Sequence, residues 1–390
     1  MKRLFLFTAT FPFGTAETFL ETEITYLAKS FIKVTIIPLT GQGNTRVVPK
    51  NCEVLNPIIK SKSKQYLYGL LFGKSLPLFI TDFFSKKVYC SINRIKQWFI
   101  AYVLTNNLLH NKSIKLLIKD LTYSDIVYFY WGKGGCYLSP YLKNKVKMVA
   151  RFHGEWDLWE ESSGGYAPLR KLIAKSLSLA VFISETGECY FKQRYPFCNT
   201  IVSRLGSADN GISKKSSDKI FRILSCSLVY PLKRVPLIYE ALQLIDNLTI
   251  EWTHIGGGRD FKTLMNIVRD TKPNISVNLL GQLSNQQVMQ FYQNNPVDLF
   301  INVSTNEGIP VSIMEAISFN VPIIGTDVGG NSEIVTTKTG FLIPSHITAE
   351  DLAKKIISIC NNSLQPRNYW SEYYNAENNY RDFAEMIHNL

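Results

Sequence analysis

The sequence predicts an α/β protein made of two tandem, doubly wound domains, each built on a parallel β-sheet. Its 390 residues are too many for one ordinary core, so two domains of roughly 150–200 residues each are expected. Short apolar segments typical of buried strands alternate with segments that carry apolar residues at helical spacing. This alternation runs twice along the chain, and a polar stretch separates the two series.

The first series begins with a strand over residues 4–9. A helix follows over residues 15–31, because Phe19, Ile24, Leu27 and Phe31 form one apolar stripe. A second strand is expected over residues 33–39, and later strands over 125–131, 146–154 and 179–185. Strand, helix and strand joined by short loops favour a parallel sheet.

The polar stretch covers residues 207–219 and contains one large apolar residue, Ile212, so we expect an interdomain linker there. The expected domains are therefore residues 1–206 and 220–368, followed by a C-terminal segment, 369–390. The second series places strands at 220–227, 248–258, 275–281 and 297–304, with helices at 235–245, 259–270 and 285–294. Ligands of such sheets bind beyond the carboxyl ends of the strands, so a cleft between the two domains is the expected site.

The composition excludes several classes of protein. An apolar content of 46% and a charged content of 19% fit a folded chain, and a net charge of +12 favours an anionic partner. Nucleic acid is not the expected partner, because the chain has no RNP-type aromatic motif, no zinc-finger spacing and no long arginine run.

The seven cysteines are scattered and form no C-x-x-C pair, which disfavours a disulfide framework or zinc site and favours a cytoplasmic protein. The basic and apolar N-terminus, "MKRLFLFTATFPFG", is too short in its apolar part for a signal peptide, so we interpret it as a buried strand. No window of about 18 residues is free of polar breaks, and no transmembrane helix is predicted.

Residues 58–105 combine basic and aromatic residues on predicted helices. Eight lysines and arginines lie there against a single acid, Asp82, with aromatics such as Tyr66, Phe84 and Trp98 between them. This pattern favours a patch that binds the membrane surface. The alternative is that the aromatics pack into the N-terminal core and the lysines are simply solvated.

The stretch "STNEGIPVSIMEAISFNVPIIGTDVGG" places Glu307 and Glu315 on either side of a helix start, with seven residues between them. Pro310 suits the first turn of that helix. A helix N-terminus offers free N–H groups and partial positive charge, which together suit a diphosphate. Gly308 permits close approach of a ligand, and the amides of Ile309, Val311 and Ser312 could then bind its phosphate oxygens.

The two carboxylates would then lie on either side of those phosphates. Glu315, about 7–8 Å along the helix, can accept hydrogen bonds from a ribose diol, and Glu307 can face a second hydroxylated group. The spacing thus suits a sugar, diphosphate and nucleoside in one molecule. The alternative is one helix-capping glutamate and one ordinary surface glutamate.

Three other strand-end loops carry candidate groups. Gly256 and Gly257 follow a strand and allow close approach of a base or ribose, and Lys233 and Arg234 follow another strand. In the N-terminal half, His153 ends a strand and is a candidate acid, base or hydrogen-bond donor. Gly14 and Glu17 lie in the first strand-to-helix loop. Each set also has a structural interpretation: solvated charge, a structural histidine, or a helix N-terminal acid.

Several motifs are missing from the sequence. It has no D-x-D triplet, so a carboxylate-held metal is not expected, and it has no Walker A, G-x-S-x-G or H-E-x-x-H motif. The glycine run "HIGGGRDF" is not G-x-G-x-x-G, which argues against an NAD-linked oxidoreductase.

Together these segments resemble the retaining, GT-B-fold glycosyltransferases of family 4, and within them bacterial O-antigen and capsule transferases. The C-terminal half carries the resemblance in "SCSLVYPLKRVPLIYEAL", "HIGGG", "VNLLGQLSNQQVMQFY" and the E-x7-E element with its following glycines. The N-terminal half carries it in "FPFGTAETFLETEI", "VYFYWGKGGCYLSPYLK" and "RFHGEWDL". It is weakest over about residues 45–120.

The resemblance implies two Rossmann-like domains facing across a cleft and a final helix that crosses back to the N-terminal domain. Glu307 would contact the donor sugar near the reacting centre, Glu315 would bind the ribose and Lys233 the diphosphate, with His153 beside the donor sugar. The implied catalytic residues are Glu307 and His153; the donor-binding residues are Lys233, Arg234, Gly256, Gly257, Gly308, Ile309, Pro310, Val311, Ser312 and Glu315; the acceptor-side residues are Gly14, Glu17 and Trp156. Many relatives carry an arginine where this chain has Leu228, so phosphate neutralisation would fall on Lys233, aided by Arg234.

The implied activity is transfer of a hexose, with retention and without a metal, from a UDP- or GDP-linked sugar; no other cofactor is expected. The expected acceptor is a polyprenyl-diphosphate-linked glycan at the inner face of the cytoplasmic membrane, which the patch at 58–105 would contact. The alternative of the same fold is a non-catalytic protein that binds sugar nucleotides or glycans.

Overall fold

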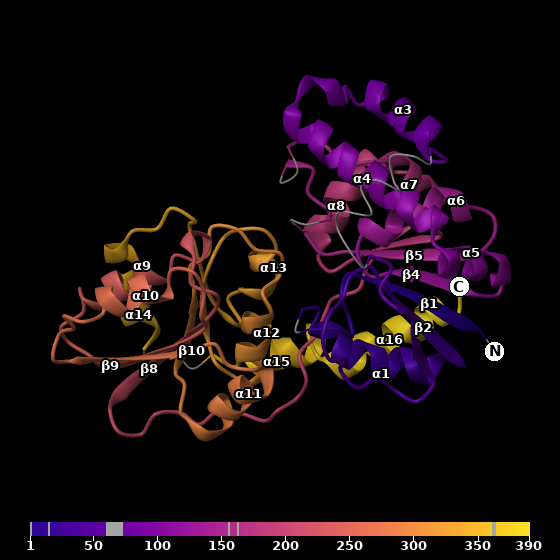
Figure 1. The fold of residues 1–390 in the computed structure, drawn as a ribbon. Coiled ribbons are helices and arrows are strands. Elements are labelled where there is room, and N and C mark those ends of the chain that lie inside the picture. The colour runs from indigo at the N-terminus through magenta and orange to yellow at the C-terminus, as the bar shows by residue number, and fades with distance from the viewer. Residues whose placement is uncertain (1, 15, 60–72, 155–156, 162–163, 361–363) are drawn as a thin grey trace. The chain divides into compact units, whose positions relative to one another are not determined.

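The computed structural model describes residues 2–14, 16–59, 73–154, 157–161, 164–360 and 364–390. They form two compact units, which appear in Figure 1. The first unit comprises Met1–Arg204 and Asn378–Leu390, and the second comprises Leu205–Glu377. Each unit is a parallel α/β sheet flanked by helices, which confirms the predicted fold class of two Rossmann-like domains.

The first unit contains a seven-stranded sheet in the order β3-β2-β1-β4-β5-β6-β7, with neighbouring strands parallel. The chain crosses outward from β1 in both directions, which is the doubly wound arrangement. Its strands are β1 (Arg3–Thr8), β2 (Lys33–Pro38), β3 (Cys52–Val54), β4 (Ile126–Phe129), β5 (Lys147–Phe152), β6 (Leu179–Phe182) and β7 (Thr200–Val202). The described helices between them are α1 (Phe19–Ser30), α3 (Leu76–Ser85), α4 (Ile92–His110), α5 (Lys112–Asp120), α6 (Ser139–Leu142), α7 (Arg170–Ser176) and α8 (Glu185–Arg194), with short 3-10 turns η1 (Val88–Cys90) and η2 (Gly134–Leu138).

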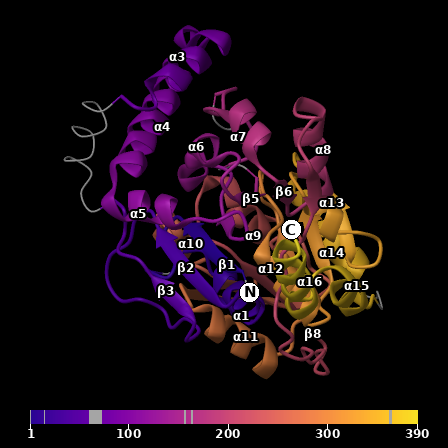
Figure 2. The ribbon, with the colours of Figure 1, turned by 90° about the vertical axis from the view of Figure 1, so that its right-hand side faces the viewer.

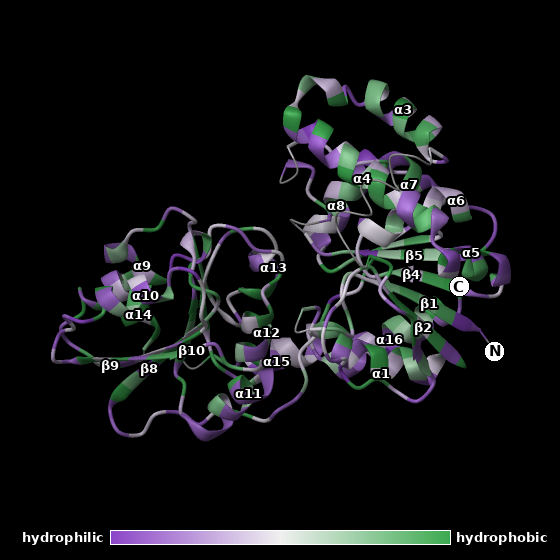
Figure 3. Ribbon diagram, in the orientation of Figure 1, coloured by the Kyte–Doolittle hydropathy of each residue, from purple (hydrophilic) through white to green (hydrophobic). Residues whose placement is uncertain are grey.

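Both faces of this sheet are buried, as the continuous apolar strands predict. Phe5 and Phe7 of β1 pack into one core, whereas Leu4 and Leu6 pack into the core on the opposite face. Figure 3 shows the hydrophobic colour running along the strands of the sheet.

The last helix of the chain, α16 (Ala376–His388), covers part of the second face. Phe383, Ala384 and Ile387 are buried in the same core as Leu4 and Leu6. α16 lies beside α1, where the rings of Tyr26 and Tyr380 are 6.4 Å apart (Figures 1 and 2). Residues from Asn378 onward therefore belong to the first unit.

The second unit has a six-stranded parallel sheet in the order β10-β9-β8-β11-β12-β13, again doubly wound from its first strand. Its strands are β8 (Ile220–Cys226), β9 (Thr249–Ile255), β10 (Ile275–Gly281), β11 (Leu299–Asn302), β12 (Ile323–Thr326) and β13 (Gly340–Ile343). Its helices are α9 (Val235–Leu242), α10 (Phe261–Ile267), α11 (Asn285–Asn294), α12 (Val311–Ser318), α13 (Asn331–Ile334), α14 (Ala349–Ile359) and α15 (Pro366–Tyr373), with the 3-10 turn η4 (Pro231–Lys233).

The segment expected as a linker, residues 207–219, lies within the second unit. The amide of Ser213 donates to the Phe319 carbonyl oxygen at 3.0 Å, and the Ser216 amide donates to Asp298 at 3.0 Å. The polar composition of this segment thus reflects its bonds along the edge of the unit. The C-terminal segment 369–390 is divided, because α15 is in the second unit and most of α16 is in the first.

Candidate functional site

Glu307 lies in the loop between β11 and α12, and the fold brings Lys233 to it. Lys233 ends the turn η4 after β8, and its Nζ lies 2.5 Å from Glu307 Oε1. Both side chains are largely buried, with exposed fractions of 15% and 11%. Two of the groups predicted from separate motifs are therefore in direct contact.

Asn302 is a further partner of Glu307 that the sequence interpretation missed. It is the last residue of β11 and is buried; its Nδ2 donates to Glu307 Oε1 at 3.2 Å, while its Oδ1 accepts from the Ser304 amide at 3.1 Å. Asn302 thus holds both the carboxylate and the loop that carries it. The sequence feature that could have indicated this role is an amide side chain at the end of an apolar strand.

The glycine pair after β12 supports the same loop from behind. A Cβ on Gly329, whose φ is +53°, would lie 1.8 Å from the Glu307 carbonyl oxygen. The Gly330 amide donates to the Gly308 carbonyl oxygen at 2.7 Å. Only glycine permits this approach of two backbones, so the pair fixes the position of Glu307.

Glu315 lies inside α12 and is 7% exposed, so it is not an ordinary surface glutamate. Asn285, the first residue of α11, donates its Nδ2 to Glu315 Oε1 at 2.6 Å. Burial raises the pKa of Glu315 to about 7, although the hydrogen bond from Asn285 opposes the shift. Asn285 is a second partner that sequence interpretation missed, because it lies 30 residues away in the chain.

The start of α12 differs by one residue from the prediction. Pro310 is the N-cap, with ψ 128°, and the helix begins at Val311. The amides of the first turn, including those of Val311 and Ser312, have no acceptor within the helix and face its N-terminal end. Ile309 is buried and Gly308 is partly exposed, so the loop that precedes these amides is accessible at Gly308.

Arg234 and the glycine run serve as supports for neighbouring loops. Arg234 Nε donates to the Val303 carbonyl oxygen at 2.7 Å, and burial lowers the pKa of its guanidinium. A Cβ on Gly256, at φ +144°, would lie 1.8 Å from the Ser227 carbonyl oxygen, which leaves no room for one. Gly257 meets nothing closer than 3.5 Å, so it is the more open of the two.

In the first unit, His153 follows β5 and packs against two aromatic rings. The ring centroids of Trp131 and Tyr130 are 4.3 Å and 4.7 Å from the imidazole centroid, and the His153 side chain is 11% exposed. Its Nδ1 is 3.5 Å from Asp157 Oδ2, within ion-pair range.

Asp157 is a buried carboxylate that joins the ends of β4 and β5. Its Oδ2 accepts from the Gly132 amide at 2.9 Å, and its Oδ1 accepts from the amides of His153 at 2.9 Å and Gly154 at 3.1 Å. Burial opposes its ionisation, but the contacts from His153 and these amides outweigh burial and hold the pKa of Asp157 below its usual value. Asp157 is therefore ionised, and its carboxylate positions the loop that carries His153.

Glu17 uses its carboxylate to hold the loop after β1. It accepts hydrogen bonds from the backbone amides of residues 9–11 at 2.7–2.9 Å and from Trp131 Nε1 at 2.6 Å. Its own φ is +56°, and Gly14 has φ +65°. Glu17 thus shapes this strand-end loop rather than forming only a helix N-terminal charge. Trp156, the third acceptor-side residue, lies outside the described residues.

Neither unit shows a metal-binding group of side chains in its described residues: no cluster of three or more His, Cys, Asp or Glu side chains has the required geometry.

Two comparisons with known proteins, one with family profiles and one with individual relatives, bear on the family of this chain. The profile of the family described as "Glycosyl transferases group 1" matches residues 210–376, which include Lys233, Glu307 and Glu315. An uncharacterized glycosyltransferase of Methanocaldococcus jannaschii is 30% identical over 269 residues, covering 67% of this chain and 70% of that protein.

Two further relatives match shorter stretches. One is the GtfA subunit of a UDP-N-acetylglucosamine–peptide N-acetylglucosaminyltransferase from Streptococcus agalactiae, which is 33% identical over 132 residues. The match spans 32% of this chain and 25% of that protein. The O-antigen biosynthesis glycosyltransferase WbnH of Escherichia coli is 30% identical over 105 residues, covering 27% of this chain and 28% of that protein.

Solved structures with the same fold include the lipopolysaccharide outer core galactosyltransferase WaaB, with a TM-score of 0.71 and 16% identity over 100% of both chains. A second is the Anabaena protein HepE in complex with UDP, with a TM-score of 0.65 and 17% identity over 100% of both chains. At these identities the likeness concerns the fold. With the match to the M. jannaschii protein and to the family profile, this chain belongs to the group 1 glycosyltransferases.

Proposed function

We propose that the protein transfers a hexose, with retention, from a UDP- or GDP-linked sugar to a polyprenyl-diphosphate-linked glycan in O-antigen or capsule biosynthesis. The cluster of Lys233, Glu307 and Asn302 before the α12 N-terminus carries this proposal. A diphosphate bound before α12 would meet one cation and a helix N-terminus, with a carboxylate on each side, and this supports the proposal. The O-antigen relative supports the choice of pathway class.

The proposed mechanism is electrostatic. Lys233 and the first-turn amides of α12 would stabilise the negative charge that develops on the leaving diphosphate. Glu315 would accept hydrogen bonds from the ribose hydroxyls, and Glu307 would contact the donor sugar near the anomeric carbon. In the first unit His153, oriented by Asp157, would serve the acceptor side. None of these roles uses a metal, consistent with the absence of a D-x-D triplet from the sequence.

A thermal-shift screen against UDP, GDP, their hexose conjugates and NAD tests the donor class. A ligand present at a hundred times its Kd adds about 2.7 kcal/mol of stability, which is readily measured. We expect a shift with one of the two nucleoside diphosphates and none with NAD. A shift with NAD alone would contradict the proposal. Nucleotide binding without release of nucleoside diphosphate, with lipid-linked acceptor present, would favour the non-catalytic alternative.

The raised pKa of Glu315 predicts that the affinity for UDP depends on pH. The ionised carboxylate accepts from both ribose hydroxyls, so affinity should rise as the pH increases through about 7, the pKa of Glu315. At pH 8, Glu315→Gln should weaken UDP binding about tenfold, because hydrogen bonds to charged groups contribute about 1.5–3 kcal/mol. Titration calorimetry from pH 5.5 to 8.5 measures this. UDP itself titrates near pH 6, so the difference between the wild type and Glu315→Gln is the relevant quantity.

The raised pKa of Glu315 also makes the stability of the folded protein depend on pH. Because the folded pKa of Glu315 is above 4.5, its protonated form favours the folded state, and this contribution is lost as the pH rises through about 7. Without ligand, the stability advantage of Glu315→Gln over the wild type should therefore grow between pH 4.5 and 7. Asn285→Ala should move the midpoint of the UDP affinity curve upward, because the Asn285 hydrogen bond lowers the pKa of Glu315.

We also propose that the first unit binds the inner face of the cytoplasmic membrane through α3 and the turn after it. Leu76, Ile80 and Phe84 lie at successive i, i+4 positions and are 38%, 44% and 65% exposed. Ile92, the first residue of α4, is also exposed, at 77%, and α3 is largely green in Figure 3. Across the described ranges, no helix has both the length and the hydropathy needed to cross a membrane.

The charges of this region suit an anionic surface. Asp82, the single acid in residues 58–105, is turned inward, where it accepts hydrogen bonds from the Tyr166 hydroxyl and, at 3.2 Å, from the Leu169 amide. Lys74 and Lys87 are exposed. Some aromatics follow the alternative interpretation: Phe79, Trp98 and Tyr102 pack against one another inside the unit. The part of the predicted patch at residues 60–72 lies outside the described residues.

Binding to vesicles tests this membrane surface. Co-sedimentation with vesicles containing phosphatidylglycerol should fall at least about tenfold in Phe84→Ser/Ile92→Ser, because about 0.8 kcal/mol is lost per buried methylene. Raising the salt concentration should weaken binding of the wild type, since each nearby lysine contributes about 1 kcal/mol. Leu116→Ser is the matched control, because Leu116 is 68% exposed on α5. Equal binding by all three proteins would exclude this surface.

A further inference from the structure

Asp82 of α3 is a buried acid that bonds to the loop between β5 and α7, the loop that begins at His153. It is 6% exposed, although it belongs to the helix whose other face is proposed to bind the membrane. Its Oδ2 accepts from the Tyr166 hydroxyl and, at 3.2 Å, from the Leu169 amide. Burial raises the pKa of Asp82, and these two hydrogen bonds oppose that shift. The buried carboxyl is therefore committed to one segment of this loop.

Arg170, which follows Leu169, joins that segment to Asp157. The Arg170 side chain is buried, and its Nη2 donates to the Asp157 carbonyl oxygen. Its guanidinium lies over the Phe152 ring, 4.9 Å from the ring centroid. The Asp157 carboxylate in turn accepts from the His153 amide at 2.9 Å. A connected series of contacts therefore runs from α3 to His153.

α4 makes a second attachment to the same loop. Arg94 Nε donates to the Gly164 carbonyl oxygen at 3.2 Å. The two helices are also joined to each other, because Trp98 Nε1 donates to the Phe79 carbonyl oxygen at 2.8 Å and the two rings pack edge to face. The Arg94 bond is exposed to solvent, whereas the bonds of Asp82 are buried, so Asp82 makes the stronger attachment.

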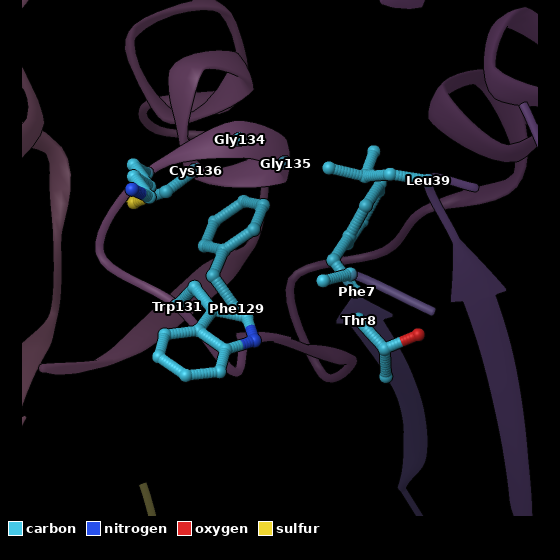
Figure 4. Close-up of a pocket in the computed structure, with 10 residues that line it drawn as sticks. Phe7, Thr8, Leu39, Phe129, Trp131, Gly134, Gly135 and Cys136 are labelled. Atoms are coloured by element: carbon cyan, nitrogen blue, oxygen red, sulfur yellow. The ribbon is translucent and has the colours of Figure 1, made fainter. Parts of the chain in front are cut away.

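The packing of His153 against Trp131 restrains the imidazole less. Trp131 lines an apolar cavity of about 310 Å³ at the carboxyl ends of β1 and β4, and its Nε1 donates to Glu17. Figure 4 shows the Trp131 ring in the wall of this cavity, with Phe7 and Leu39 across from it. Where a ring faces a cavity it has no packed atoms to restrain it. The position of His153 therefore depends strongly on the bonds through Asp157.

We propose that Asp82 is a positioning residue for His153, on which it acts through Arg170 and Asp157. Without the two hydrogen bonds of Asp82, the segment before Arg170 can shift, and the guanidinium shifts with it. The Asp157 carbonyl then loses its donor, and the carboxylate no longer holds the His153 amide in one place. The catalytic consequence rests on the proposed function, in which His153 serves the acceptor side.

Hydrogen exchange of backbone amides tests this link without a substrate. The amides of His153 and Gly154 donate to Asp157, so their exchange reports whether that carboxylate is in place. Asp82→Ala should speed their exchange about tenfold, and Tyr166→Phe, which keeps the second bond of Asp82, should have a smaller effect in the same direction. Asp82→Asn keeps an acceptor oxygen and should restore most of the protection.

Ser75→Ala is the matched control. Ser75 is the buried N-cap of α3, and its hydroxyl donates to Asn106 of α4 at 2.8 Å rather than to the loop. Its loss should leave the exchange of the His153 amide unchanged. Equal acceleration in Ser75→Ala and Asp82→Ala would show that α3 contributes only general stability, and unchanged exchange in Asp82→Ala and Tyr166→Phe would show that the link is absent. Either result overturns the proposal.

Turnover measures the catalytic consequence, with the hexose nucleotide that the thermal-shift screen identifies and a lipid-linked acceptor. Tyr166→Phe should lower kcat about tenfold, since a misplacement of about 1 Å can cost a hundredfold, and should leave the affinity for UDP unchanged. In a His153→Ala background the same substitution should have no further effect on kcat. A full additional loss there would overturn the positioning role. Faster exchange of the His153 amide with unchanged kcat would refute the proposed role of His153 and not the link from Asp82.

Discussion

Glu307→Gln should lower kcat by about 10²–10³-fold while the affinity for UDP stays equal or rises. The carboxylate pairs with Lys233 at 2.5 Å and accepts from Asn302 at 3.2 Å. Glutamine keeps the shape and an acceptor oxygen but removes the negative charge from the proposed sugar site. Lys233, no longer neutralised by a carboxylate, becomes a better partner for a diphosphate, so binding of the nucleotide should not weaken.

The measurement is a pair of experiments on one protein: steady-state release of nucleoside diphosphate and calorimetric binding of UDP. Lys233→Met is the contrasting variant, because it should weaken UDP binding as well as turnover by removing the cation. Glu350→Gln, on the exposed first turn of α14, should change neither quantity. Unchanged turnover in Glu307→Gln would remove Glu307 from the reacting centre.

Arg151→Met should destabilise the first unit by about 3–5 kcal/mol, because it leaves a carboxylate buried without its counter-charge. Arg151 and Glu23 are both fully buried, and the guanidinium Nη1 lies 2.5 Å from Glu23 Oε2. The Tyr128 hydroxyl donates to the other oxygen of Glu23 at 3.0 Å. The Phe383 ring of α16 covers the guanidinium, 4.0 Å from its carbon.

The stability that Arg151→Met loses should depend on pH. Burial raises the pKa of Glu23, and Arg151 opposes that shift, so the variant should raise it further. A raised carboxyl pKa favours the folded state at low pH and loses that contribution as the pH rises through the folded value. Urea unfolding should therefore show a larger loss at pH 8 than at pH 5.

A second substitution provides the control. Glu23→Leu added to Arg151→Met should restore most of the stability, since an apolar pair of similar volume often replaces a buried ion pair at little cost. Equal stability of Arg151→Met and the wild type at pH 8 would show that the pair does not hold α1 against the sheet.

The candidate site was only partly visible in the sequence. Glu307, Glu315 and the helix start between them were predicted because Gly308 and Pro310 mark a helix start within a few contiguous residues. Asn302 and Asn285 were missed because an asparagine at a strand or helix end is common and carries no distinguishing pattern. Asp157 was missed because its role depends on the Gly132 amide, which lies in the loop after another strand, β4.

Helical versus strand spacing of apolar residues, and Gly or Pro at the ends of segments, are local properties. By itself the sequence therefore determined the two doubly wound α/β domains and the position of the helix after Glu307. Only the tertiary structure decided which groups meet: Lys233 reaches Glu307 across 74 residues, and Arg151 reaches Glu23 across 128. Such pairs follow from the order of strands in the sheet, and strand order is set by packing across the whole unit rather than by any one segment.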